Sequence, residues 1–340
     1  MLNNRYHDIL SHLITDYIAT SGAVGSGQLS KKMALRLSPA TIRNVMADLE
    51  EMGYLSQPHT SAGRIPTQKG LRYYVDTLVG ERTLTDDEKR TIQEQYQMPE
   101  KDIRSLMLKT GKVLASFSKY AGLVLTPKLE KTLFKHIEFL PLSSGKLLGI
   151  FVSQTGVVEN IILETKEEIN YRELEKINNY CNASFVGLSL EEAIEKVNYE
   201  LSLANQEYDK LLTKALLLSQ ELLTHIETSD LVVEGETQLL ETPEFSTVGR
   251  VKELMKILEE KKQLLQMLDS CLMSPGVRIF IGSESHCDAA KNLSFITATY
   301  KQGRHIVGTL GVIGPTRMDY AKVIPVVDFT AKFVSDLLAN

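Results

Sequence analysis

The chain contains few cysteines, no long hydrophobic run and no overall excess of positive charge. Its 3 cysteines among 340 residues, Cys181, Cys271 and Cys287, are too few and too scattered for a disulfide framework or a metal site. No apolar run approaches the ~20 residues of a membrane-spanning helix, and polar residues interrupt the N-terminus, unlike a signal peptide. We therefore expect a cytoplasmic protein, and the hydrophobic fraction of 43% predicts folded domains throughout.

The net charge of −5 superficially disfavours nucleic-acid binding, but the charge is unevenly distributed. Residues 1–80 hold 8 Lys and Arg against 6 Asp and Glu, whereas the rest of the chain holds 30 against 37. The N-terminal segment is therefore the net positive part, by a small margin. This margin predicts modest non-specific affinity for DNA, with specificity depending on base contacts and on two copies binding together.

Residues 38–53 predict a helix with an unusual outer face. Ser38 is a favourable N-cap, Pro39 suits the first helical position, and Gly53 is placed to end the helix. The apolar face consists of Ile42, Val45, Met46 and Leu49. The outer face consists of Ala40, Thr41, Arg43, Asn44 and Ala47. Alanines let a helix approach a groove closely, and Asn, Arg and Thr match adenine, guanine and the thymine methyl group. The alternative is an ordinary amphipathic helix with a short polar face.

The preceding residues favour the DNA-binding interpretation. Apolar residues at helical spacing predict a first helix over 3–20, ended by Ser21. Ser26 then caps a short helix over 27–34 with Leu29 and Met33 inward, and a tight turn leads to Ser38. Helix, short helix, turn and capped helix are the helix-turn-helix arrangement.

A short polar turn follows and resembles a wing. Residues 54–57 predict a strand that Pro58 confines to an edge. The turn over 59–63 ends at Gly63, which is free to adopt positive φ, and Arg64 projects beyond it. Thr67 caps the next helix. The predicted DNA contacts, to bases, phosphates or a minor groove, are Gln28, Lys31, Ser38, Thr41, Arg43, Asn44, His59, Thr60, Ser61, Arg64, Lys69 and Arg72. For each cation among them, a solvated surface charge is the alternative.

With these residues in place, the chain resembles the HrcA family of bacterial heat-inducible transcription repressors. The matching segments are Ser38–Asn44, Gly53–Leu55, Gln57–Thr67 and Leu310–Ile324, and the resemblance extends over nearly the whole length. It implies a winged helix-turn-helix, a GAF-like domain and an inserted dimerisation domain. It also implies a homodimer that represses chaperone operons through an inverted-repeat operator, assisted by a GroEL-type chaperonin.

The remaining sequence predicts both helices and strands. A charged linker over 80–102 runs into a short helix, and a second helix covers 103–120. Hairpin-like turns separate predicted strands over 134–142, 146–153 and 157–164. Residues 170–228 predict helices, and the last, over 208–226, is apolar on more than one side. That helix belongs either to a central core or to a subunit interface.

The C-terminal third predicts one helix over 251–272, strands over 277–282, 295–300 and 306–313, and a closing helix from Tyr320 interrupted at Pro325. The predicted fold class is therefore α+β and multidomain. A winged helix-turn-helix would cover 1–80, and a discontinuous GAF-like antiparallel α/β sheet domain would cover 81–165 and 230–340. A helical inserted dimerisation domain would cover 166–229.

Two other functions compete with this interpretation. A metabolite-responsive repressor would need a pocket in the GAF-like domain, and the polar candidates to line it are Ser283, Glu284, His286, Arg304 and Arg317. Gly308, Gly311 and Gly314 are better explained by backbone packing than by phosphate binding. An enzyme would need a catalytic constellation, but His286 and Cys287 have no partner at ligand spacing, and Asp86, Asp87 and Glu88 resemble solvated linker residues. We therefore predict no catalysis, metal or cofactor.

Overall fold

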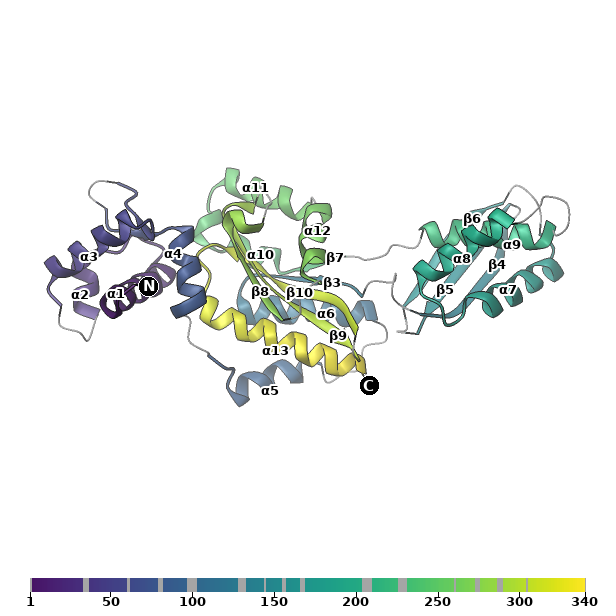
Figure 1. Cartoon of the computed structure of the whole chain (residues 1–340), viewed down its shortest axis with the longest axis horizontal. Helices are drawn as coiled ribbons and strands as arrows, with labels where there is room; N and C mark the ends of the chain where they lie inside the picture. Colours follow the sequence, from purple (N-terminus) through teal and green to yellow (C-terminus); the bar gives the residue numbers. More distant parts are fainter. Residues whose placement is uncertain are drawn as a thin grey trace.

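The structure is a computed structural model. It describes residues 2–32, 37–59, 62–78, 82–96, 103–127, 133–143, 145–154, 157–165, 169–203, 210–225, 231–259, 261–272, 276–285, 290–303 and 305–339. The predictions for Met33, Thr60, Ser61, His286, Cys287 and Arg304 fall outside these residues. The described chain is α+β, with helices and antiparallel sheets in three parts that follow one another along its long axis (Figure 1).

The first part is a small helical module with a two-stranded sheet. Its elements are α1 (Asn4–Thr20), α2 (Ser26–Lys32), α3 (Pro39–Glu51), β1 (Leu55–Ser56), β2 (Ile65–Pro66), α4 (Gln68–Tyr73) and the π-helix η1 (Tyr74–Leu78). Ser21 in the left-handed conformation ends α1, as expected. The apolar faces of α1 and α3 meet in a core that includes Leu10, Leu13, Ile42 and Leu49.

Two helices connect this module to the central part. The helix α5 (Asp86–Glu94) begins within the segment predicted to be linker, and α6 (Ile103–Ser118) follows. Thr85 and Glu88 form a reciprocal capping box at the start of α5. Asp86, Asp87 and Glu88 therefore form the first turn of a helix, where the positive end of the helix dipole stabilises carboxylates.

The central part is a five-stranded antiparallel sheet in the order β7-β3-β10-β9-β8. Its strands are β3 (Ala121–Leu125), β7 (Leu231–Glu234), β8 (Val277–Ile281), β9 (Leu293–Gln302) and β10 (His305–Pro315). The strand β3 was not predicted from the sequence, because it is fully buried and has no polar alternation. Because β3 precedes the other four strands by about a hundred residues, the sheet closes around a long insertion.

Helices cover both faces of this sheet (Figure 1). On one face lie α6 and α13 (Tyr320–Ala339), and on the other lie α10 (Glu236–Leu240), α11 (Val248–Glu259) and α12 (Lys261–Cys271). Two helices thus replace the single one predicted over 251–272, and α13 continues through Pro325 instead of breaking there. The close packing explains the glycines of β10, because a Cβ at Gly308 would lie 2.3 Å from the Tyr300 hydroxyl oxygen.

The third part combines a three-stranded sheet with three helices. Its strands are β4 (Phe134–Ser143), β5 (Lys146–Ser153) and β6 (Val158–Glu164), in the order β4-β5-β6, and its helices are α7 (Tyr171–Phe185), α8 (Leu190–Leu203) and α9 (Lys210–His225). They share a separate hydrophobic core that includes Phe139, Phe151, Ile177 and Leu222.

This third part corrects the expected domain boundary. The strands were predicted where they occur, but they were assigned to the same domain as the C-terminal strands. In the structure they pack on α7, α8 and α9, so the inserted module spans about 133–225 instead of 166–229. Period-two alternation shows that one face of a strand is buried, but not which helices bury it.

The inserted sheet has one sealed edge and one uncovered face. The side chains of Asn178 and Asn182 on α7 bind the outward N–H and C=O groups of Phe139 and Ile137, as a further strand would. The opposite edge strand, β6, pairs with β5 alone among the described strands. The face turned away from the helices carries six aliphatic residues, Leu140, Leu148, Ile150, Val152, Val158 and Ile162, together with His136, Glu138 and Asn160 from the same cross-strand pairs. Ile162 is 62% exposed.

Candidate nucleic-acid interface

The helix α3 is built as the sequence predicts and presents its outer face to solvent. The Ser38 hydroxyl accepts a hydrogen bond from the Thr41 N–H at 3.1 Å, and Pro39 occupies the first turn. Gly53 has φ of +78°, which ends the helix in the left-handed region. Arg43 and Asn44 are exposed. Their side chains therefore stand on the free face of a helix whose opposite face is locked into the core.

Polar contacts to one buried carboxylate hold α2 against α1. The Asp16 carboxylate is buried on α1. It accepts a hydrogen bond from Gln28 Nε2 at 2.8 Å and forms an ion pair with Lys32. Gln28 was a predicted backbone-contact residue, but its amide is engaged within the module. Lys31 lies on the same helix and is exposed, so it remains a candidate for a DNA backbone contact.

The turn after α3 is held against the α1–α2 connection. Arg64 and Val24 exchange two backbone hydrogen bonds of 2.9 Å, and β1 pairs with β2 beside them. A Cβ at Gly63 would lie 2.3 Å from the Val24 carbonyl oxygen, so glycine is required here for close approach. The expectation that Gly63 serves a positive φ was wrong, because its φ is outside that region.

The Arg64 guanidinium turns toward the module instead of projecting from the turn. Its Nε lies 2.7 Å from Glu50 Oε2 on α3, and its side chain is only 19% exposed. In this conformation it ties the turn to α3. His59 stands exposed on the same turn.

Lys69 and Arg72 occupy α4 but have different surroundings. The exposed Lys69 ammonium donates to the Met52 carbonyl at 2.8 Å and lies 4.5 Å from the centre of the Tyr54 ring. Arg72 donates to Glu284 and to the Ile279 carbonyl of the central sheet. The prediction that Arg72 meets DNA phosphate is therefore corrected: its donors face the central domain.

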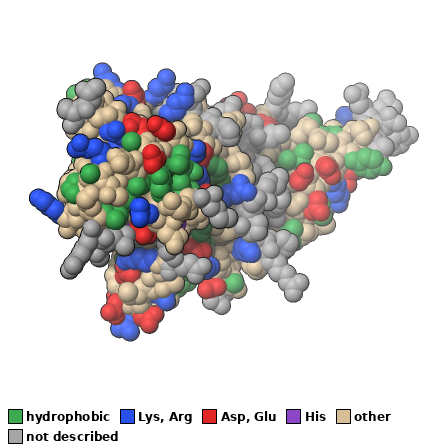
Figure 2. Space-filling view, turned by 60° about the vertical axis from the view of Figure 1, so that its left-hand side comes forward, with side chains coloured by type: hydrophobic (Ala, Val, Ile, Leu, Met, Phe, Trp, Pro, Cys, Tyr) green, Lys and Arg blue, Asp and Glu red, His purple; other side chains and the backbone are tan. Residues whose placement is uncertain are grey.

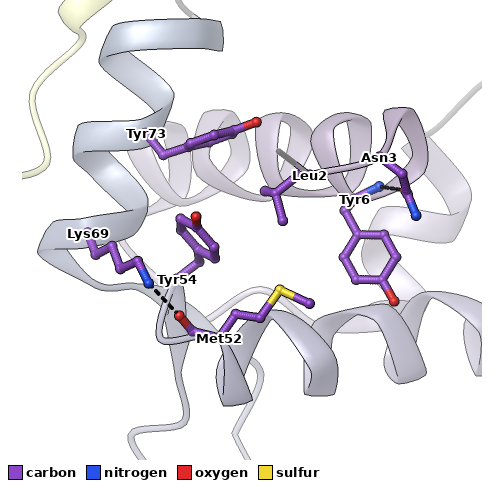
Figure 3. A pocket seen from close by; sticks show the side chains of 7 residues that line it. All are labelled: Leu2, Asn3, Tyr6, Met52, Tyr54, Lys69 and Tyr73. Atoms are coloured by element: carbon purple, nitrogen blue, oxygen red, sulfur yellow. Dashed lines mark hydrogen bonds between the residues drawn. The ribbon is translucent and has the colours of Figure 1, made fainter.

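A hollow of about 610 Å³ opens beside these residues (Figure 3). It is lined by Leu2, Asn3, Tyr6, Met52, Tyr54, Lys69 and Tyr73, from the start of α1, the end of α3 and α4. The Tyr6 hydroxyl donates to Asp48 on α3, and this hydrogen bond raises the pKa of Tyr6. The hollow lies at the C-terminal end of α3, away from Arg43 and Asn44 near its beginning.

Charges are scattered over the visible face of the N-terminal end (Figure 2). Lys and Arg side chains stand among Asp and Glu and beside hydrophobic side chains, without one continuous basic stripe. This distribution agrees with the small positive margin of residues 1–80, and it limits the non-specific electrostatic attraction to DNA.

The residues proposed to line a metabolite pocket have other partners. Ser283 donates to Gln68 on α4 at 2.7 Å, and Glu284 binds Arg72. Arg317 binds Glu244 at 2.5 Å and the Ile18 carbonyl on α1. These contacts join the central and N-terminal parts, so these three residues do not form a ligand pocket.

The described residues give no support to a metal centre or a membrane segment. Among them, no group of three or more His, Cys, Asp and Glu is placed to hold a metal ion. No described helix combines the length and the apolar character that crossing a bilayer requires.

Comparison with known proteins decides the family. The family model described as the HrcA protein C terminal domain matches residues 104–324. The chain belongs to the HrcA family. The heat-inducible transcription repressor HrcA of Geobacter sulfurreducens is 46% identical over 99% of this chain and 98% of its own length. The protein of the same name from Syntrophobacter fumaroxidans is 41% identical over 99% and 97%.

A solved structure shares the fold of this HrcA family member. The crystal structure of a hypothetical protein, 23% identical, covers 100% of this chain and 99% of that one with a TM-score of 0.67. The names of the curated relatives are those of transcription repressors, so the expectation of a regulator and not an enzyme is confirmed at the level of the family.

Proposed function

We propose that this chain is a heat-inducible transcription repressor that binds an inverted-repeat operator as a homodimer. Residues 1–80 act as a winged helix-turn-helix, and α3 enters the major groove of each half-site. The single observation that carries the proposal is the outer face of α3. Exposed Arg43 and Asn44 stand on a helix whose cap, end and buried face are all fixed.

In this proposal, Asn44 and Arg43 read base edges, while Ser38 and Thr41 contact the backbone beside the helix start. His59 and its neighbours Thr60 and Ser61 form the wing contact, and Lys31 and Lys69 supply phosphate contacts. Arg64 contributes by holding the wing against α3 through Glu50. Because the module carries little excess charge, sequence-specific contacts account for most of its selectivity.

Dimerisation is proposed to occur through the inserted module. Its uncovered sheet face carries six apolar side chains, including Val158 at 54% exposure and Ile162 at 62%. Exposed apolar patches of this kind favour protein interfaces. A two-fold axis through this face would pair it with the same face of a second copy, as closed dimers require. An inverted-repeat operator matches that symmetry.

The central five-stranded sheet, with helices on both faces, is proposed to be the GAF-like domain. The strand order of this domain supports the proposed assistance by a GroEL-type chaperonin. The strand β3 lies between β7 and β10, so it completes its pairing only after residues far along the chain have arrived. Such non-local pairing is slow and leaves apolar surface exposed meanwhile. The repressor is proposed to act in the cytoplasm, where its operator and chaperonin are found.

The first test is a titration of the purified full chain against three labelled duplexes at one near-physiological salt concentration. One carries an inverted repeat that the protein selects from a random pool, one carries a half-site, and one is scrambled. Tight binding to the inverted repeat alone supports a dimeric, sequence-specific repressor. Equal weak binding to all three, even after treatment with chaperonin and ATP, would refute the proposal.

A further inference from the structure

Two arginines join the N-terminal module to the central sheet domain. Arg72, on α4 of the module, reaches into the sheet domain. Arg317, which follows β10 in the sheet domain, reaches back to α1 of the module. Their partners are separated from them by 212 and 299 residues in sequence. The two contacts therefore run in opposite directions across one interface.

Each of the three nitrogens of the Arg72 guanidinium has a hydrogen-bond partner. Its Nε lies 3.0 Å from Glu284 Oε1, one terminal nitrogen binds the other Glu284 oxygen and the Ile279 carbonyl, the latter at 2.6 Å, and the second terminal nitrogen lies 3.1 Å from Asp76 Oδ1. Glu284 also accepts the Ile281 N–H at 2.9 Å. This paired geometry fits the planar fork of arginine and not the point charge of lysine.

The electrostatics of Glu284 agree with this geometry. Partial burial alone raises the pKa of Glu284, but the Arg72 guanidinium and the Ile281 N–H together lower it below its ordinary value. Glu284 therefore stays ionised when it faces Arg72, and the hydrogen bonds that Arg72 donates to Glu284 raise the pKa of Arg72 in turn. The pair is a charge-assisted contact between two modules.

Arg317 makes the reciprocal contact. Its side chain is only 11% exposed, its Nε binds Glu244 of the same domain at 2.5 Å, and a terminal nitrogen donates to the Ile18 carbonyl. Ile18 lies in the last turn of α1, where carbonyls have no partner within the helix and attract positive charge. Glu244 thus aims Arg317 at the end of the first helix of the DNA-binding module.

A third contact lies beside Arg72. The Gln68 side chain accepts from Ser283 at 2.7 Å, and it passes so close to Gly282 that a Cβ there would lie 2.0 Å from Gln68 Nε2. Interfaces between domains usually permit relative motion unless specific contacts prevent it. The three contacts hold the module at two ends, at α4 and at the end of α1, so they resist both rotation and hinge opening.

We propose that Arg72 and Arg317 are positioning residues that fix the angle of the DNA-binding module on the central domain, and thereby the spacing of operator half-sites that the dimer accepts. This inference rests on the proposed function. A dimer gains affinity from its second module only when both half-sites can be reached together. Rigidly held modules fit one spacing between half-sites. Modules that can rotate fit several spacings, but each such complex gains less affinity from its second half-site.

The experiment uses the full chain and the selected inverted repeat, its half-site, a scrambled duplex, and a series whose central spacer changes one base pair at a time. The variants are Arg72→Lys, Arg317→Lys and Glu284→Gln, and thermal unfolding verifies that each is folded. Arg250→Ala is the matched control, because Arg250 forms a surface ion pair with Glu253 within one helix. Each variant is expected to bind the full repeat about 10- to 100-fold more weakly, to bind the half-site as the wild type does, and to tolerate altered spacers. Arg250→Ala is expected to match the wild type.

Glu284→Gln separates this role from a phosphate contact by the sign of its effect. If Arg72 bound phosphate, removing its acidic partner would release it and strengthen binding to every duplex, and Arg72→Lys would be nearly neutral. Those results overturn the proposal, as do unchanged affinity and spacing preference in all three variants. If the wild type itself fails to prefer the full repeat, the proposed function fails first.

Discussion

The outer face of α3 and the outer face of the inserted sheet are both uncovered in the single chain, but their chemistry differs. On α3 stand Arg43 and Asn44 among small residues, whereas on the sheet six aliphatic side chains from Leu140 to Ile162 share the face with a few polar ones. Polar groups that hydrogen-bond to water lose little by staying exposed, whereas aliphatic surface gains free energy by leaving water. The first surface is therefore suited to a hydrated, charged partner and the second to another protein surface.

The largest expected effect comes from breaking the apolar face. Ile162→Glu should convert the proposed dimer to a monomer, because a buried carboxylate would face the partner's apolar surface. Operator affinity should fall about 100-fold or more as the second half-site is lost. Analytical ultracentrifugation and the operator titration measure both effects. Tyr199→Glu is the control, since Tyr199 is similarly exposed but lies on α8, on the helical side of the module. A dimeric Ile162→Glu protein would exclude this face as the interface.

A smaller effect is expected on the polar face. Asn44→Ala should weaken binding to the specific operator by about 1–3 kcal/mol and leave scrambled DNA unaffected. The fold should be unchanged, because the Asn44 side chain is exposed. Paired titrations on both duplexes give the difference directly. An equal loss on specific and scrambled DNA would mean that Asn44 contacts the backbone.

Variants at Ser38 test how far the outer face of α3 depends on the N-cap of the helix. Ser38→Ala removes the acceptor for the Thr41 N–H and should lower the free energy of unfolding by about 1 kcal/mol. Ser38→Asp retains the cap but adds negative charge at the proposed DNA contact. Because Ser38 is both the cap and a proposed backbone contact, both variants should bind the operator more weakly, but only Ser38→Ala should unfold at a lower denaturant concentration. Unaltered stability of Ser38→Ala would show that the rest of the module holds the helix.

The smallest effect concerns a buried thiol in the inserted module. Burial raises the pKa of Cys181 to about 11, although Ser219 partly offsets this, so the thiol stays protonated at neutral pH. We expect very slow alkylation of Cys181 in the native protein and fast alkylation in denaturant, measured on its peptide by mass spectrometry. The rate should be the same in Ile162→Glu, because Cys181 lies in the core on the helical side. If Cys181 were alkylated fast in Ile162→Glu and slowly in the wild type, the variant would be monomeric because its inserted module had unfolded.

Much of the fold followed from local sequence. The Ser38 cap, the Pro39 start, the apolar stripe and Gly53 defined α3 within a few residues, because each acts through neighbours along the chain. Turn residues and alternation likewise predicted β4, β5 and β6. The uniformly apolar β3 was missed, since a strand buried on both faces has no alternation to detect.

The candidate site was predictable in its exposed part and not in its charged contacts. Arg43 and Asn44 are where helical periodicity places them. Arg64, Arg72 and Gln28 are engaged by Glu50, Glu284 and Asp16, and no sequence pattern gives these pairings because the partners are distant or lie on other helices.

By itself, the sequence determined the family, the helix α3 with its cap and the other local elements, because capping, periodicity and turn chemistry depend on neighbouring residues. Tertiary structure alone decided that the three-stranded sheet joins the inserted helices and leaves one face, with its exposed aliphatic side chains, uncovered. It also decided that Arg72 and Arg317 serve the contact between modules. The physical reason is that both depend on residues distant in sequence. Which helices cover a strand, and which charge a long side chain meets, is decided only when folding brings those residues into contact.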